Sequence, residues 1–158
     1  MIRHATPDDV PTIAELIRAL AEYEKLSHEA QFSTEDLRQA LFGERRYAEV
    51  LLAEDAGGVV GFALYFHNFS TFLAKPGIYL EDLFVRPERR GEGHGRALLA
   101  SLARIAVERG CGRLEWAVLD WNEPSIGFYR SLGAMPMEDW TTFRLTGDAL
   151  VTLAVRSD

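Results

Sequence analysis

The sequence predicts an α/β protein with a mixed, mostly antiparallel central sheet and helices on both faces. Two β-rich runs, 47–54 and 59–66, are joined by Asp55-Ala56-Gly57-Gly58, which is typical of a tight hairpin turn. Amphipathic helical runs lie before and after these strands. A glycine-rich loop joins the strand at 78–85 to the next helix, as in a crossover connection. Together these observations favour a mixed sheet over an all-β or all-helical fold.

The N-terminal part predicts one short strand and two helices. The strand is Ile2 to Ala5. The next four residues, 6–9, have the pattern of a helix start, with proline at the first helical position and an acid three residues after Thr6. The second, shorter helix starts at 33–36, runs toward Phe42 and ends at Gly43. The apolar residues of the first helix recur at helical spacing: Val10, Ile13, Leu16, Ile17 and Leu20.

The C-terminal half predicts alternating helices and strands. A helix follows the glycine-rich loop to about Arg109, where glycines end it. We expect a strand at 114–119, a helix at 123–132 and a final strand at 141–145, while residues 146–155 fit either a short helix or an edge strand. The 158 residues suffice for one domain with a substantial core, so we expect a single domain, 1–158.

Composition and charge disfavour several classes of protein. The longest apolar run, 57–66, is far shorter than the roughly 20 residues that span a bilayer, and the N-terminus lacks the apolar core of a signal peptide, so we expect a cytoplasmic protein. A net charge of −7 argues against nucleic-acid binding and suits a cationic small substrate. Four scattered histidines and the lone Cys111 make no zinc-type cluster, so we expect no metal.

The stretch from Arg90 to Gly95, Arg-Gly-Glu-Gly-His-Gly, lies between a strand and a helix. Glycines there let backbone N–H groups face an anion, and the helix N-terminus adds partial positive charge, so the stretch predicts a phosphate site. The plain structural alternative is a tight turn that needs positive φ. The Gly-x-Gly-x-Gly spacing differs from the Gly-x-Gly-x-x-Gly of dinucleotide-binding folds, and three strands precede it, which disfavours that fold.

Acidic and polar residues near this loop are candidates for chemistry. Glu81 and Asp82 lie inside an apolar strand, where carboxylates are costly without partners. Period-two alternation places Glu81 with Tyr79 and Leu83, and Asp82 with Leu80 and Phe84. Asn122 is a candidate helix N-cap, and Tyr129 follows two helical turns later. Glu115 fits either a site residue or an ordinary exposed strand residue.

The motif formed by Arg90, Gly93 and Gly95 resembles the acetyl-coenzyme A signature Arg/Gln-x-x-Gly-x-Gly/Ala of the Gcn5-related N-acetyltransferase (GNAT) superfamily. Within it, the chain is similar to the diamine acetyltransferase group, which includes spermidine/spermine and thialysine N-acetyltransferases. This similarity runs from Ile2 to about Leu150. Its most specific stretch is Trp121 to Tyr129; others are Tyr23-Glu24, Phe42-Gly43-Glu44, 79–82, Phe84-Val85, Phe128-Tyr129 and Trp140.

The resemblance implies direct transfer of an acetyl group from acetyl-coenzyme A to a primary amine in a ternary complex. It makes Glu81 the candidate base, acting directly or through a water, and Tyr129 the candidate general acid. It further implies a homodimer. The implied amine site consists of Tyr23, Glu24, Glu81, Asp82 and Trp140. The implied cofactor site consists of Leu83, Phe84, Val85, Arg90, Gly91, Glu92, Gly93, His94, Gly95, Arg96, Asn122, Glu123, Pro124, Ser125 and Tyr129.

Other functions remain open from the sequence. The acceptor could be another primary amine, such as an amino acid, an aminoglycoside or a protein lysine. A second class is a non-catalytic acyl-coenzyme A sensor, although a sensor would need neither Glu81 nor Tyr129. A dinucleotide-binding protein is the third alternative, which the order of elements disfavours.

Overall fold

A computed structural model describes residues 1–156 of the chain, which cluster into two compact units. The first unit is Met1–Leu119, and the second begins at Asp120. No helix among the described residues is long and apolar enough to cross a membrane. The elements are β1 (Ile2–His4), α1 (Val10–Tyr23), α2 (Thr34–Phe42), β2 (Glu49–Asp55), β3 (Gly58–Ser70), β4 (Lys75–Val85), α3 (His94–Glu108), β5 (Leu114–Trp116), α4 (Glu123–Ser131) and α5 (Gly147–Ala154).

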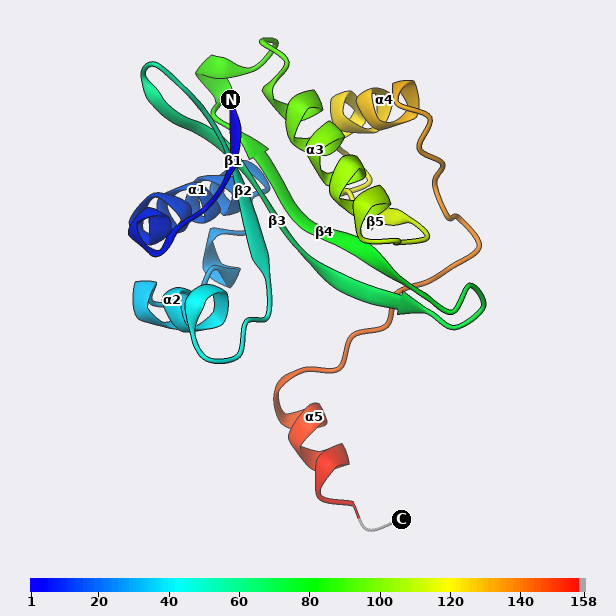
Figure 1. Cartoon of the computed structure of the whole chain (residues 1–158). Coiled ribbons are helices and arrows are strands. Elements are labelled where there is room, and N and C mark those ends of the chain that lie inside the picture. The colour runs from blue at the N-terminus through cyan, green and yellow to red at the C-terminus, as the bar shows by residue number, and fades with distance from the viewer. Residues whose placement is uncertain (157–158) are drawn as a thin grey trace. The chain divides into compact units, whose positions relative to one another are not determined.

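The first unit is built on a five-stranded sheet in the order β1-β2-β3-β4-β5 (Figure 1). Each pair from β1 to β4 is antiparallel, and only β4 and β5 run parallel. The sheet is therefore mixed and mostly antiparallel, as predicted, and it differs from the parallel sheet of a dinucleotide-binding fold. The predicted hairpin at 55–58 is confirmed, because Asp55 pairs with Gly58.

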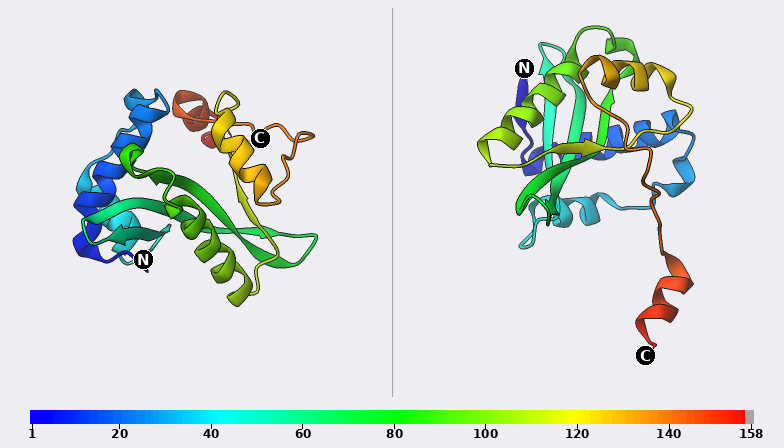
Figure 2. Two further views of the ribbon diagram at one scale, coloured as in Figure 1. Left: turned by 90° about the horizontal axis from the view of Figure 1, so that it is seen from above. Right: turned by 90° about the vertical axis from the view of Figure 1, so that its right-hand side faces the viewer.

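Helices cover both faces of this sheet, with α1 and α2 on one face and α3 on the other (Figures 1 and 2). The α1 face carries one core cluster, to which α1, α2 and three strands contribute. Burying such side chains contributes on the order of 2 kcal/mol each, which fixes α1 on the sheet. The buried members of this cluster are Ile13, Leu16, Leu20, Leu41, Val50, Leu52, Phe62 and Phe84.

The β3–β4 hairpin is longer than the sequence predicts. The predicted strands end at Phe66 and begin at Ile78, but pairing continues from His67 with Ile78 to Ser70 with Lys75. Residues such as Asn68 and Gly77 have low strand propensity, and only their partners across the hairpin hold them in the sheet. Sequence periodicity therefore missed the outer part of both strands.

The second unit contains α4 and α5. The predicted helix at 123–132 is confirmed, and Asn122 is its N-cap, as predicted, with its Oδ1 accepting from the Ser125 N–H at 3.4 Å. The predicted strand at 141–145 is wrong, because that segment pairs with no strand of the sheet. β-propensity alone does not make a strand without a partner edge. Residues 147–154 form α5, so the helix alternative was correct there.

Candidate functional site

The candidate site in the first unit begins at a bulge in β4. Leu64 of β3 pairs with Asp82, but the next residue, Tyr65, pairs with Leu80. Glu81 therefore has no partner on β3 and is the extra residue of a β-bulge. Bulges bend a strand and change the direction of its side chains, so this one sets the local geometry of both acids.

The bulge corrects the period-two assignment made from the sequence. Leu64 and Phe66 are two residues apart on β3 and so lie on one face. Their β4 partners are Asp82 and Tyr79, which must share that face. Leu80 pairs with Tyr65 and so lies on the opposite face, which makes the expectation that Asp82 and Leu80 share a face wrong. Glu81 has no partner on β3 that assigns it to a face, and its charge acts on both Tyr79 and Asp82. On the C-terminal side of the bulge the period-two prediction is confirmed. There Asp82 shares a face with Phe84, which belongs to the core cluster below α1.

Three carboxylates gather where α1 ends against this face. Glu24 follows α1, and its charge, with that of Glu81, acts on Asp82. Burial, then the Glu81 and Glu24 carboxylates, raise the pKa of Asp82 to about 7. Burial also raises the pKa of Glu24. Among residues 1–156, none of the three forms an ion pair with a basic side chain, so this acidic cluster (Glu24, Glu81 and Asp82) lacks a counter-cation from the described chain.

The glycine loop lies at the C-terminal end of β4. Gly91 and Gly93 have φ of 84° and 87°, a backbone conformation that favours glycine. These two positions agree with the plain structural alternative of a turn. Gly95 differs, since it lies in the first turn of α3 and a Cβ there would meet only the Val85 side chain, at 3.9 Å. Neither φ nor crowding explains Gly95, whereas a ligand that approaches the backbone closely would.

Backbone groups with unused hydrogen-bonding capacity surround this loop. In the described chain no group accepts the N–H groups of residues 91–96, and the first intrahelical bond of α3 is from Ala97 to Gly93. Such donors at a helix N-terminus favour anions. Among residues 1–156, β5 pairs with β4 only from Ile78 to Leu80, and no other strand pairs with the segment 81–85 on that side. An extended ligand can pair with such an edge.

Arg90 connects the glycine loop to α1. Its guanidinium lies 4.5 Å from the centroid of the Tyr23 ring and 5.5 Å from that of Phe84. Its Nε donates to the Val85 carbonyl oxygen at 3.1 Å. The loop therefore has fixed contacts with both α1 and β4. Sequence spacing gave no sign of this contact, because Tyr23 and Arg90 are far apart in the chain.

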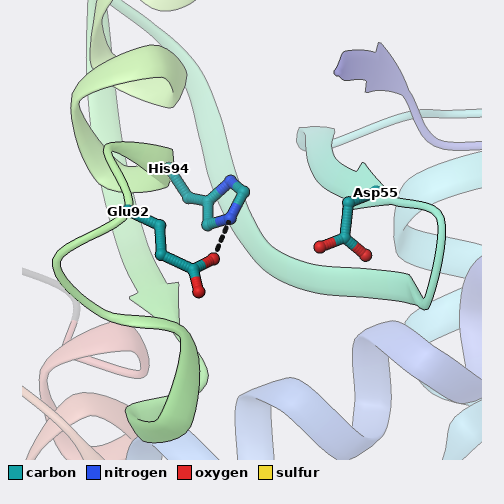
Figure 3. A group of neighbouring side chains, drawn as sticks. All are labelled: Asp55, Glu92 and His94. Carbon is teal, nitrogen blue, oxygen red and sulfur yellow. Dashed lines mark hydrogen bonds and ion pairs between the residues drawn. The ribbon is translucent and has the colours of Figure 1, made fainter.

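A second cluster beside the loop was also missed by sequence reasoning. Asp55, Glu92 and His94 bring their ligating atoms within 4.8 Å of one another (Figure 3). His94 Nε2 and Glu92 Oε2 are 3.0 Å apart. Arg89 forms ion pairs with both Asp55 and Glu92, which lowers the pKa of each carboxyl. Arg89 already pairs with both carboxylates, so the trio is explained as part of an ion-pair network that ties the loop to the β2–β3 turn.

Comparison with known proteins decides the family. Residues 14–134 match the Acetyltransferase (GNAT) family. The chain is a GNAT acetyltransferase. It is 43% identical to thialysine N-epsilon-acetyltransferase of Bos taurus, covering 98% of this chain and 96% of that protein. It is 35% identical to an L-ornithine N5-acetyltransferase of Arabidopsis thaliana, covering 94% and 85%. Membership implies acetyl-coenzyme A as cosubstrate.

Solved structures place this acetyltransferase in the same fold. An integron cassette protein from the mobile metagenome of V. cholerae superposes with a TM-score of 0.80 at 30% identity, covering 99% of this chain and 98% of that one. The predicted GNAT-like fold is therefore confirmed.

The predicted site residues of the acetyltransferase fall into both compact units. The first unit brings the acidic cluster, Tyr23 and the glycine loop to the same end of β4. The second unit carries Tyr129 on α4, half-buried and with its ring 5.6 Å from that of Phe128, and Trp140, which is 78% exposed. Asn122 is buried and caps α4. The remaining cofactor candidates of this unit, Glu123, Pro124 and Ser125, form the first turn of α4.

Proposed function

We propose that this acetyltransferase, acting as a single domain over 1–158, transfers an acetyl group to a primary amine of a small cationic molecule in one ternary complex. The observation that carries this proposal is the acidic cluster, which lacks a counter-cation beside the glycine loop. Glu24 and Asp82 are half-buried, where carboxylates are costly unless a cation balances them, and an ammonium group does so. The relatives named for thialysine and L-ornithine support an acceptor of this class.

The glycine loop and the open edge of β4 fit the cosubstrate. N–H groups from Gly91 to Arg96 would hold the pyrophosphate, and the backbone of Leu83 to Val85 would pair with the pantetheine arm. Asn122 to Ser125 would complete the cofactor site, a role that rests on the resemblance to the family. When bound, the cosubstrate supplies an acetyl thioester.

Two proton transfers are assigned to this chain. An alkylamine with a pKa of about 10.4 is almost fully protonated at pH 7, and only the neutral form attacks. Glu81 is the proposed base, directly or through a water, because it is the bulge residue and its carboxyl is exposed at the acidic cluster. Tyr129 is the proposed general acid, whose hydroxyl protonates the leaving sulfur. Tyr23, Glu24, Asp82 and Trp140 would bind the rest of the amine.

Release of free thiol from acetyl-coenzyme A tests this function. The acceptors are thialysine, ornithine, lysine, spermidine, putrescine, an aminoglycoside and a histone-tail peptide. We expect turnover with one or more small amines, and a loss of about 10²-fold or more in kcat for Glu81→Gln. Glu108→Gln, at an exposed position on the far end of α3, is the matched control. Thiol release only with the peptide, or unchanged turnover in Glu81→Gln, would contradict the proposal.

We also propose a homodimer. The segment after α4 presents many large apolar side chains to solvent, and such surfaces mark association sites in soluble proteins. Light scattering should give twice the monomer mass, and a monomer at micromolar concentration would contradict the proposal. The side chains concerned are Met135, Met137, Trp140, Phe143, Leu145, Leu150, Val151, Leu153 and Val155.

A further inference from the structure

A polar network lies farther along the face that carries the acidic cluster. Glu115 of β5 is directly opposite Tyr79 of β4, so their side chains share this face. The Asn68 Nδ2 donates to Glu115 Oε1 at 3.3 Å, and Arg113 Nε lies 3.4 Å from the same oxygen. Three strands or strand ends thus contribute to one group of side chains, all within the first unit.

Gly77 makes this network possible. Asn68 pairs with Gly77 and reaches across β4 to Glu115 on β5. A Cβ at position 77 would collide with Asn68 Oδ1. Gly77 is buried and its φ is not positive, so the room it leaves for the Asn68 amide explains the glycine. The network is therefore held by the packing of the strands as well as by its own polar contacts.

Tyr79 joins this network to the acidic cluster. Burial raises the pKa of the Tyr79 hydroxyl, and the carboxylates of Glu81 and Glu115 raise it further, so both act on the same phenol. Arg113 precedes Leu114, the partner of Ile78, and so lies level with Gly77, about 13–16 Å from Asp82 along β4. An extended ornithine or lysine spans this distance only together with the long side chains of Arg113 and of the acids at its two ends.

The acidic cluster and the polar network around Glu115 differ in charge. The acidic cluster has no counter-cation among the described residues, whereas the polar network has the Arg113 guanidinium beside the Glu115 carboxylate. The side chain of Arg113 is 50% exposed, and Glu115 is its only ion-pair partner in the part of the chain that the structure describes. A surface pair of this kind contributes little to stability. A planar guanidinium does, however, match a carboxylate in two-point hydrogen bonding.

We propose that Arg113, held by Glu115 and Asn68, binds the α-carboxylate of the acceptor, so that the preferred substrates are α-amino acids whose side chain ends in a primary amine. Glu115 Oε2 then faces the α-ammonium group, and the distal amine extends past Tyr79 to Glu81 and Asp82. This inference rests on the proposed function. It separates amino-acid acceptors from diamines and polyamines, which lack the carboxylate.

Matched acceptors test the inference directly. Ornithine and putrescine differ by the α-carboxylate, and so do lysine and cadaverine. We expect the ratio of kcat/KM for ornithine over putrescine to fall about tenfold or more in Arg113→Gln, mainly through the KM of ornithine. The kcat/KM for putrescine should stay within about twofold, because the distal amine site is unchanged. Arg113→Lys should restore part of the ratio, since it keeps the charge and loses the planar fork.

The outcomes separate the carboxylate site from the acetyltransferase function on which it rests. Arg104→Gln, which removes an exposed arginine of α3, is the matched control and should leave the ratio unchanged. Equal losses for ornithine and putrescine in Arg113→Gln, or no loss for either, would overturn the carboxylate site while leaving the acetyltransferase proposal in place. A wild-type enzyme that prefers putrescine to ornithine would do the same. Failure to acetylate any of the four amines would overturn the small-amine function itself.

Discussion

Replacing Asp82 by asparagine should stabilise the protein, and increasingly so as the pH rises. The pKa of Asp82 is raised from 3.8 to about 7, because of burial and the neighbouring Glu81 and Glu24 carboxylates. The folded chain therefore binds this proton more tightly than the unfolded chain. The favourable contribution is complete below about pH 4, is lost as the pH rises toward 7, and stays lost above it. Asparagine, which has no charge, avoids that loss.

The size of the effect follows from the shift. A difference of about three pH units between folded and unfolded chains corresponds to about 4 kcal/mol at pH 8. Asp82 is half-buried and keeps contact with solvent. We therefore halve the value for screening, to about 2 kcal/mol. For a chain of this length that free energy corresponds to about 4–8 °C in Tm.

Thermal unfolding of wild type and Asp82→Asn at pH 5, 6, 7 and 8 measures this. The Tm difference should be smallest at pH 5, where it is a little under half of its final value, grow through pH 6 and 7, and level off near pH 8. Asp139→Asn changes an exposed aspartate and is the matched control, for which we expect no trend. A Tm difference that is flat or falls with pH would refute the assignment of a raised pKa. We also expect Asp82→Asn to raise the KM for the amine. The charged Asp82 carboxylate destabilises the folded chain but attracts the cationic substrate, and asparagine removes both effects.

Three further predictions concern the acid, the loop and the ion-pair network. Tyr129→Phe should lower kcat by about 10²-fold or more with little change in acetyl-coenzyme A affinity, and unchanged turnover would remove the tyrosine from its role. Gly93→Ala should cost about 1–2 kcal/mol in urea unfolding, because its φ is 87°. Gly127→Ala in α4, where an added Cβ would meet nothing within 4 Å beyond its chain neighbours and the helix's own backbone, should instead stabilise by about 0.5–1 kcal/mol, and equal effects would contradict this account. Dialysis against EDTA should leave turnover unchanged, since Arg89 already forms ion pairs with both Asp55 and Glu92; activity lost to EDTA and restored by a divalent cation would show that the trio binds a metal.

The sequence predicted the elements whose signals are local. The hairpin turn at 55–58, the cap of α4 at Asn122 and the end of α2 at Gly43 depend on residues adjacent in the chain. Amphipathic spacing likewise predicted α1, because its buried residues recur at helical intervals. Each of these features depends on interactions within a few residues, which a linear pattern records.

The strand predicted at 141–145 shows the limit of this reasoning. Its residues have the composition of a strand, but a strand also needs a neighbouring edge with which to exchange hydrogen bonds. The outer ends of β3 and β4 show the converse, since Asn68 and Gly77 join the sheet although their own propensities oppose it. In both cases the partner strand decides the outcome.

The sequence by itself determined the fold class, the glycine loop and the choice of Glu81 and Asp82 as candidate site residues. Residue type and short spacing are enough for those inferences. Only the tertiary structure decided how the acids are oriented. The bulge at Glu81 becomes visible when β4 is paired with β3, since it is a mismatch between two strands and not a property of one. The same is true of the contact of Arg90 with Tyr23, the ion pairs of Arg89 and the network around Arg113. These contacts join residues on different elements, so packing determines them and sequence periodicity does not.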